Sequence, residues 1–63
     1  MDAQAVWRQL SEAYGADSDR VKDLAIALLY WLDQGGCPPI VTGNGDFDRL
    51  IVWTSCLAVV KRY

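Results

Sequence analysis

The sequence predicts an all-α fold, a compact three-helix domain formed by the single unit 1–63. Three observations support this prediction. Two stretches carry apolar residues at helical spacing. Cap residues and glycines divide the chain into three segments. The last segment, Phe47 to Tyr63, has seventeen residues without glycine or proline, which is long for one strand in so small a domain.

The first helix is expected at about residues 2–14. Asp2 can accept hydrogen bonds from the free N–H groups of the first turn, and Gly15 can end the helix. The apolar residues recur at intervals of three and four and define a single face: Ala3, Val6, Trp7, Leu10, Ala13 and Tyr14.

The second helix is expected at about residues 18–34, after a cap at Asp17 or Ser18. Gly35-Gly36 can end it, because glycine adopts a positive φ without strain. Its apolar residues form a wide arc: Val21, Leu24, Ala25, Leu28, Leu29, Trp31 and Leu32. Ile26 and Tyr30 depart from this arc, because they fall together among the acidic residues of the polar face.

The third helix is expected at about residues 46–62, with Asp46 as its cap, and it is apolar nearly all round. One face carries Phe47, Leu50, Ile51, Leu57 and Ala58. The other carries Val52, Trp53, Cys56, Val59, Val60 and Tyr63. Such a helix is normally buried on both sides. We therefore expect it to lie at the centre of the fold, or to be covered by a second copy or another partner.

The three helices are expected to share one core, formed by Leu10, Leu24, Leu28, Leu32, Leu50, Thr54 and Leu57. An alternative fold is α+β, with two helices plus a hairpin around Asn44-Gly45. This dipeptide is a strong hairpin-turn signal, and residues rich in β-formers stand on both sides of it. The sequence leaves open whether 46–62 is one helix or begins as a strand.

Composition argues against several classes of partner. The net charge is −2, and the six basic residues form no patch that could neutralise phosphates, so no nucleic acid is expected. No apolar run reaches the ~20 residues that span a bilayer, so no membrane partner is expected. The first residues lead directly into an amphipathic pattern instead of a signal peptide. Two cysteines are too few for a disulfide framework, which favours a cytoplasmic location.

The residue types also argue against catalysis. The chain has no histidine, so it lacks the usual general base and cannot form a Cys–His pair. Asn44-x-Asp46-x-Asp48 supplies the first three ligand positions of a calcium loop, but Arg49 and Ser55 occupy the places of its glycine and final glutamate. A turn that feeds a helix cap is the better interpretation. We expect no enzymatic activity, no cofactor and no metal.

The leading hypothesis is a non-enzymatic protein–protein interaction module that acts through an exposed apolar and aromatic helical surface. An apolar patch with a charged rim is the usual form of such a surface. The expected interface residues are Ile26, Tyr30, Val52, Trp53, Cys56, Val59 and Val60. The partner is another protein, a second copy, or both, so homo-oligomers are expected. The class is an adaptor or inhibitor, of the kind that phages and other mobile elements encode, although no residue indicates that origin.

The alternative hypothesis is a small-ligand or nucleotide-binding protein. It uses the loop Gly35–Asp46, which is rich in glycine and leads to a helix start, together with Trp31 or Trp53 nearby. Its weakness is the acidic residues at the end of the loop, which would repel a phosphate.

Overall fold

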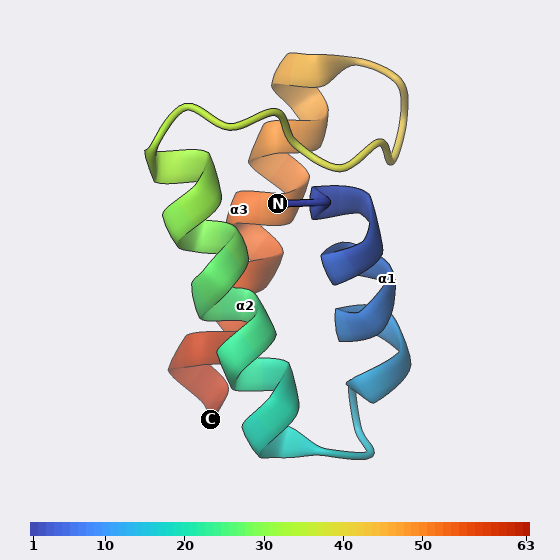
Figure 1. Ribbon diagram of the computed structural model, residues 1–63. Coiled ribbons are helices and arrows are strands. Elements are labelled where there is room, and N and C mark those ends of the chain that lie inside the picture. The colour runs from blue at the N-terminus through green and yellow to red at the C-terminus, as the bar shows by residue number, and fades with distance from the viewer.

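The computed structural model describes all 63 residues and contains three helices and no strand (Figure 1). Helix α1 spans Ala3–Ala13, α2 spans Ser18–Asp33 and α3 spans Gly45–Arg62. The predicted all-α fold is confirmed. The alternative with a hairpin is wrong, because Asn44 caps α3 and Gly45 already belongs to the helix.

Each helix begins at a side chain that accepts a hydrogen bond from its first turn. Asp2 accepts from the N–H of Ala5 at 3.2 Å, and Asp17 accepts from the N–H of Arg20 at 3.1 Å. For α3 the cap is Asn44, whose Oδ1 lies 3.1 Å from the backbone nitrogen of Phe47. The predicted cap at Asp46 is therefore wrong by two residues, because Asn44 offers the same acceptor earlier in the chain.

Helix α2 ends in a glycine turn. Gly35 has a φ of 87°, and its N–H donates to the carbonyl of Leu32 at 3.1 Å. The N–H of Gly36 donates to the carbonyl of Trp31 at 2.9 Å. This pair of bonds is the Schellman motif, which satisfies the last carbonyls of a helix and requires a positive φ. The chain then leaves the axis of α2 and crosses to the start of α3.

Helix α2 is the central element of the fold. It packs against α1 and α3, whereas these two make no close backbone contact with each other. Figure 1 shows that consecutive helices run in opposite directions, so α1 and α3 are parallel. None of the three helices has the length and hydropathy needed to cross a lipid bilayer. Of the two alternatives expected for the third helix, the central position is wrong, because α2 takes that place. Cover by a second copy or another partner stays a prediction.

The core is built around one face of α2, whose buried residues have no exposed surface: Val21, Ala25, Leu28 and Leu32. Helix α1 adds Ala3, Leu10 and Ala13, and helix α3 adds Val52, Cys56 and Val59. The predicted core is thus correct for Leu10, Leu28 and Leu32. Leu24 is only partly buried, although it packs against this cluster.

The predicted core is wrong for α3. Leu50, Thr54 and Leu57 are all exposed, whereas Val52 and Cys56 on the opposite face are completely buried. The helix is rotated by about half a turn from the expected orientation. Both faces are apolar, so their hydrophobicity alone did not distinguish the inner face from the outer one.

The loop of residues 34–44 is fastened to all three helices. The indole Nε1–H of Trp31 donates to the carbonyl of Cys37 at 2.8 Å. The side-chain amide of Gln4 accepts from the N–H of Ile40 at 2.7 Å and donates to the carbonyl of the same residue at 3.5 Å. The guanidinium of Arg49 donates to the carbonyls of Leu32 and Gly36. These contacts hold an irregular segment in one conformation.

We predict that Gly36→Ala destabilises the fold. A Cβ at this position would overlap the Cε2 and Cδ2 atoms of the Trp31 ring, which the hydrogen bond to Cys37 holds in place. Overpacking of this kind costs about 1–3 kcal/mol. We expect a midpoint of thermal unfolding lower by more than about 5 °C, measured by circular dichroism.

Gly45→Ala is the matched control. Nothing lies within 4 Å of a Cβ at Gly45, which is the first residue of α3. Alanine is also the better helix former, so the midpoint should stay unchanged or rise slightly. Equal midpoints for the two variants would show that the Trp31 ring does not hold Gly36 in this way.

Candidate functional site

The carboxylate of Asp48 organises the start of α3. It is only 2% exposed and accepts four hydrogen bonds from the end of the loop. Its Oδ1 accepts from the N–H of Thr42 at 2.7 Å and from the hydroxyl of the same residue at 2.6 Å. Its Oδ2 accepts from the N–H groups of Val41 at 3.2 Å and Gly43 at 3.1 Å. Gly43 closes this turn with a φ of 92°, which favours glycine.

These hydrogen bonds lower the pKa of Asp48 below its ordinary value of 3.8. The hydroxyl of Thr42 is the largest cause, and the backbone N–H groups of Thr42, Val41 and Gly43 add to it. Burial acts in the opposite direction, because it disfavours the charged form. The donors outweigh burial, so the carboxylate remains ionised inside the fold at neutral pH.

The position of Asp48 determines which face of α3 points inward. Residues four apart lie on the same side of a helix, so Val52 and Cys56 share the buried side with Asp48. Val59 completes this inner face. The opposite side of the helix, half a turn away, is left to solvent.

The outward side of α3 is an apolar strip that we call the outer stripe. It consists of Phe47, Leu50, Ile51, Thr54, Leu57 and Ala58. Phe47 is 52% exposed, Leu50 is 59% exposed and Leu57 is 46% exposed, while Ile51 is half-buried. Asp46 stands at the N-terminal end of the outer stripe and Lys61 at its C-terminal end, both exposed. Large apolar residues gathered on one exposed helix face are characteristic of binding surfaces.

Five of the seven predicted interface residues lie in α3, and none of the five is fully exposed. Val52, Cys56 and Val59 are buried, and Trp53 and Val60 are partly buried against the core. The prediction that this side of the helix is exposed is corrected. The prediction is thus reversed on α3: Leu50, Thr54 and Leu57, predicted in the core, are exposed, and Val52, Cys56 and Val59, predicted at the interface, are buried. The two sides are equally apolar, so hydrophobicity does not distinguish them.

The polar strip of α3 is a further reason for this reversal. Asp48, Ser55 and Arg62 lie on one side of the helix, which suggests a side that faces water. In the structure Asp48 is buried and Ser55 is half-buried. Arg62 donates from Nη1 to the hydroxyl of Tyr14, the C-cap of α1, at 3.1 Å. Asp48 and Arg62 therefore make contacts within the chain, and the apolar residues of the outer stripe face solvent.

Ile26 and Tyr30 do form an exposed patch, on the outward face of α2. Tyr30 is 68% exposed, and Ile26 is also exposed. The acidic residues on this face, all exposed, are Asp19, Asp23 and Asp33. The predicted interface is thus divided: these two residues lie on the surface, and the α3 members are buried or partly buried. Whether a partner uses the α2 patch stays a prediction.

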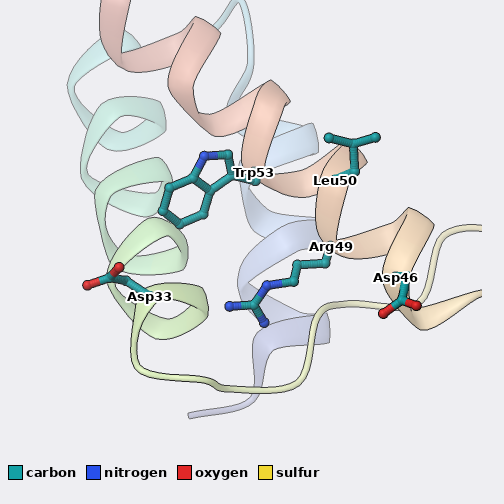
Figure 2. A pocket seen from close by; sticks show the side chains of 5 residues that line it. All are labelled: Asp33, Asp46, Arg49, Leu50 and Trp53. Atoms are coloured by element: carbon teal, nitrogen blue, oxygen red, sulfur yellow. The ribbon is translucent and has the colours of Figure 1, made fainter.

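A pocket of about 390 Å³ opens beside the outer stripe, where α2 ends and α3 begins (Figure 2). Asp33, Asp46, Arg49, Leu50 and Trp53 line it. Figure 2 shows the indole of Trp53 above the guanidinium of Arg49, with the two carboxylates at separate edges. Arg49 is already bound to the carbonyls of Leu32 and Gly36. The pocket therefore has an aromatic wall and two carboxylates. The one cation in its lining, Arg49, is already hydrogen-bonded to backbone carbonyls.

The loop itself offers little to an anion. The N–H groups of residues 41–43, which a phosphate could have used, donate to the carboxylate of Asp48. Asn44 caps α3 and also donates its N–H to the hydroxyl of Thr42 at 3.2 Å. The Asn44-x-Asp46-x-Asp48 pattern is thus a turn and a helix cap. No group of three or more acidic or cysteine side chains is arranged to hold a metal ion.

The two cysteines have different surroundings. Cys37 lies exposed in the loop, and Cys56 is buried in the core. Burial raises the pKa of the Cys56 thiol to about 11, because the thiolate would lose its hydration. Cys56 therefore packs as a small apolar side chain.

Comparison with known proteins gives no lead beyond this geometry: no family model matches the chain, and no curated protein or solved structure matches it significantly. The fold and the surface alone define the class of molecule, a small three-helix domain with an unpartnered apolar helix face.

We predict that Asp48→Asn lowers the midpoint of thermal unfolding at pH 7 by more than about 5 °C. An amide cannot accept all four donors of residues 41–43. The lowered pKa gives a second signature. The stabilisation by the carboxylate is complete above the unfolded-state pKa near 3.8 and is lost as the pH falls through the lower folded-state value. The difference in unfolding midpoint between Asp48→Asn and the original chain should therefore become smaller in acid.

Asp46→Asn serves as the control, because Asp46 is exposed in the same turn and accepts none of the bonds from the loop. The midpoint of thermal unfolding of this variant should stay close to that of the original chain at every pH from neutral to strongly acidic. If the difference in unfolding midpoint between the original chain and Asp48→Asn stayed constant in acid, the ionised carboxylate would not have this role.

We predict that only one cysteine reacts with a thiol reagent in the folded chain. At pH 8 a thiol with a pKa of about 11 is ionised in roughly one molecule in a thousand. In a Cys37→Ser variant, Ellman's reagent should therefore give no rapid colour until denaturant is added. In a Cys56→Ala variant, Cys37 should react within the mixing time of an ordinary assay. Rapid reaction of Cys56 would mean that α3 opens readily from the core.

Proposed function

We propose that the chain is a non-enzymatic protein-interaction module and that the outer stripe is its binding surface. The observation that carries this proposal is the exposure of Phe47, Leu50 and Leu57 on one face of an 18-residue helix. A compact monomer normally scatters such residues or covers them. Here the core is already complete without them, since α1, α2 and the inner face of α3 fill it.

The spacing of the outer stripe suits a helix that docks in an apolar groove or against another helix. Phe47, Leu50 and Leu57 serve as anchors, separated by three and seven residues. Thr54 lies between the anchors and Ala58 directly follows the last of them; both are small, so a partner can approach the helix backbone closely. Full burial of each large side chain contributes about 1.5–3 kcal/mol before the costs of association.

The fold suits a partner-occupying role more than a catalytic one. The loop contacts and the Asn44 cap hold α3 in place, so its surface requires little ordering when it binds. A small rigid domain of this kind acts by covering a surface of a larger protein or by joining two proteins. The class that fits is an adaptor or inhibitor.

A second candidate function is the binding of a small ligand in the pocket at Trp53. Its volume of about 390 Å³ falls in the range of roughly 300–1,000 Å³ of small-molecule sites. The two carboxylates and the indole favour a cationic ligand, such as an amine or a guanidinium, over a nucleotide. Titration of tryptophan fluorescence tests it, with Trp53→Phe as the control that should abolish any saturable change.

A photo-crosslinking experiment tests the interaction surface directly. A benzophenone side chain replaces Leu57 in the outer stripe, and in a control chain it replaces Ser11, which is exposed on α1. Irradiation in cells that express the chain should give discrete adducts of higher mass for position 57 only. Similar adducts from both positions, or none from either, would contradict the proposal.

We predict that Leu50→Asp combined with Leu57→Asp weakens partner binding at least tenfold, about 1.4 kcal/mol or more. Two charges in a desolvated interface are unfavourable, whereas in the free chain both positions face water. The midpoint of thermal unfolding should therefore change by only a few degrees. A chain with the benzophenone at Phe47 reports binding through the yield of the adduct.

Two further variants make this prediction specific. Ile26→Asp with Tyr30→Asp changes the exposed patch of α2 and should leave the adduct at Phe47 intact. Val52→Asp buries a charge in the core and should unfold the chain. If the α2 variant abolished the adduct and the α3 variant did not, the binding surface would lie on α2.

A further inference from the structure

The outer stripe carries opposite charges at its two ends. Asp46 lies at the N-terminal end of α3, and Lys61 lies at the C-terminal end on the same outward side. Between them the exposed positions are apolar or small. A surface with this pattern is complementary to a copy of itself that runs in the opposite direction. The same surface facing a parallel copy would bring like charges together at both ends.

We propose that the occupant of the outer stripe is a second copy of this chain, packed antiparallel about a two-fold axis at Thr54. This inference rests on the proposed function, because it names the partner of the same surface. With the axis at Thr54, Phe47 lies opposite Lys61 of the partner subunit. Leu50 lies opposite the partner's Ala58, and Ile51 lies opposite the partner's Leu57. One patch then meets itself, which is the geometry of an isologous dimer.

This register pairs one large residue with a small one, whereas Ile51 and the partner's Leu57 pack as two large side chains. Each large Leu50 meets a small alanine, and the residue at the axis is the small Thr54. A helix pair can therefore approach closely at the centre, with leucine side chains filling the space above the alanines. Phe47 covers the methylene groups of the partner's Lys61, whose ammonium group remains in water.

The charges specify the direction of pairing. Asp46 lies within about one turn of the partner's Lys61 at each end of the interface, so the dimer gains two such pairs. The positive end of each helix dipole also meets the negative end of the other, which adds to the same preference. Exposed ion pairs contribute little to affinity, but like charges in the parallel arrangement would oppose it.

The extent of the surface indicates a reversible dimer. The chain exposes 4091 Å², and a standard stable interface uses about 800 Å² from each partner, close to a fifth of that surface. The outer stripe has six residues, fewer than the roughly 20–30 that each side of a standard interface uses. We expect monomers and dimers to exchange, with dimers prevailing at high concentration.

Orientation-specific disulfides test the pairing. In a Cys37→Ser background, Leu50→Cys and Ala58→Cys chains are mixed and oxidised mildly. The antiparallel register places position 50 of one chain opposite position 58 of the other, so the mixed dimer should form faster than either like pair. A parallel register would favour the like pairs instead and would overturn the proposal. Glu12→Cys, at an exposed position of α1, gives the rate of disulfide formation by random collision.

Charge exchange gives an independent readout by light scattering over a wide concentration range. The original chain should shift from monomer to dimer mass. Asp46→Lys or Lys61→Asp alone should raise the dissociation constant about three- to tenfold, because each creates two like-charge contacts per dimer. The double variant should restore the original value. Circular dichroism checks that α3 remains intact, since Asp46 also lies in its first turn.

Failure of this inference is distinguishable from failure of the proposed function. A chain that stays monomeric throughout and forms no preferential 50–58 disulfide has no antiparallel dimer. If the benzophenone at position 57 then yields an adduct with a different protein, the outer stripe is still a binding surface and only the identity of its partner is wrong. If it yields no adduct, both proposals fail.

Discussion

The contact between the Asp48 carboxylate and the loop determines the rotation of α3, and much of the structure depends on that rotation. Four donors of residues 41–43 converge on this side chain, which is almost wholly buried. Without Asp48 these backbone groups would lack partners within the fold. Once Asp48 points inward, Val52 and Cys56 must follow it, and the opposite side of the helix must face solvent.

The hydrogen bonds of Asp48 decide which of the two apolar faces of α3 points inward. Hydrophobic burial alone would not favour one face over the other. Either side of α3 could have covered α2, and the outer stripe contains the larger side chains. The inner side is narrower, with Val52, Cys56 and Val59 packed against a face of α2 that includes Ala25. The bulky side is left exposed. A surface of this composition is unfavourable in isolation, which is why its occupation by a partner is the natural functional reading.

The loop before α3 links this rotation to the rest of the fold. It is fastened by Gln4 from α1, by Trp31 from α2, and by Asp48 and Arg49 from α3. Many of its polar groups are hydrogen-bonded within the chain. The pocket beside it owes its shape to the same contacts, because Arg49 is held between the end of α2 and the loop.

The sequence by itself determined the number of helices, two of the three caps and the glycine ends, as well as the exposure of Ile26 and Tyr30. These features depend on residues close together in the chain, such as Asp17 with Arg20 and Gly35 with Leu32. Only the tertiary structure decided the rotation of α3, the central place of α2, and hence the exposed stripe. The physical reason is that α3 is apolar on both sides, so its orientation was chosen by Asp48 and its loop donors together with packing against α2. The Asp48 contacts join the helix to an irregular loop only five to seven residues away, and the packing against α2 joins segments farther apart in the chain. Helical periodicity carries no information about either contact.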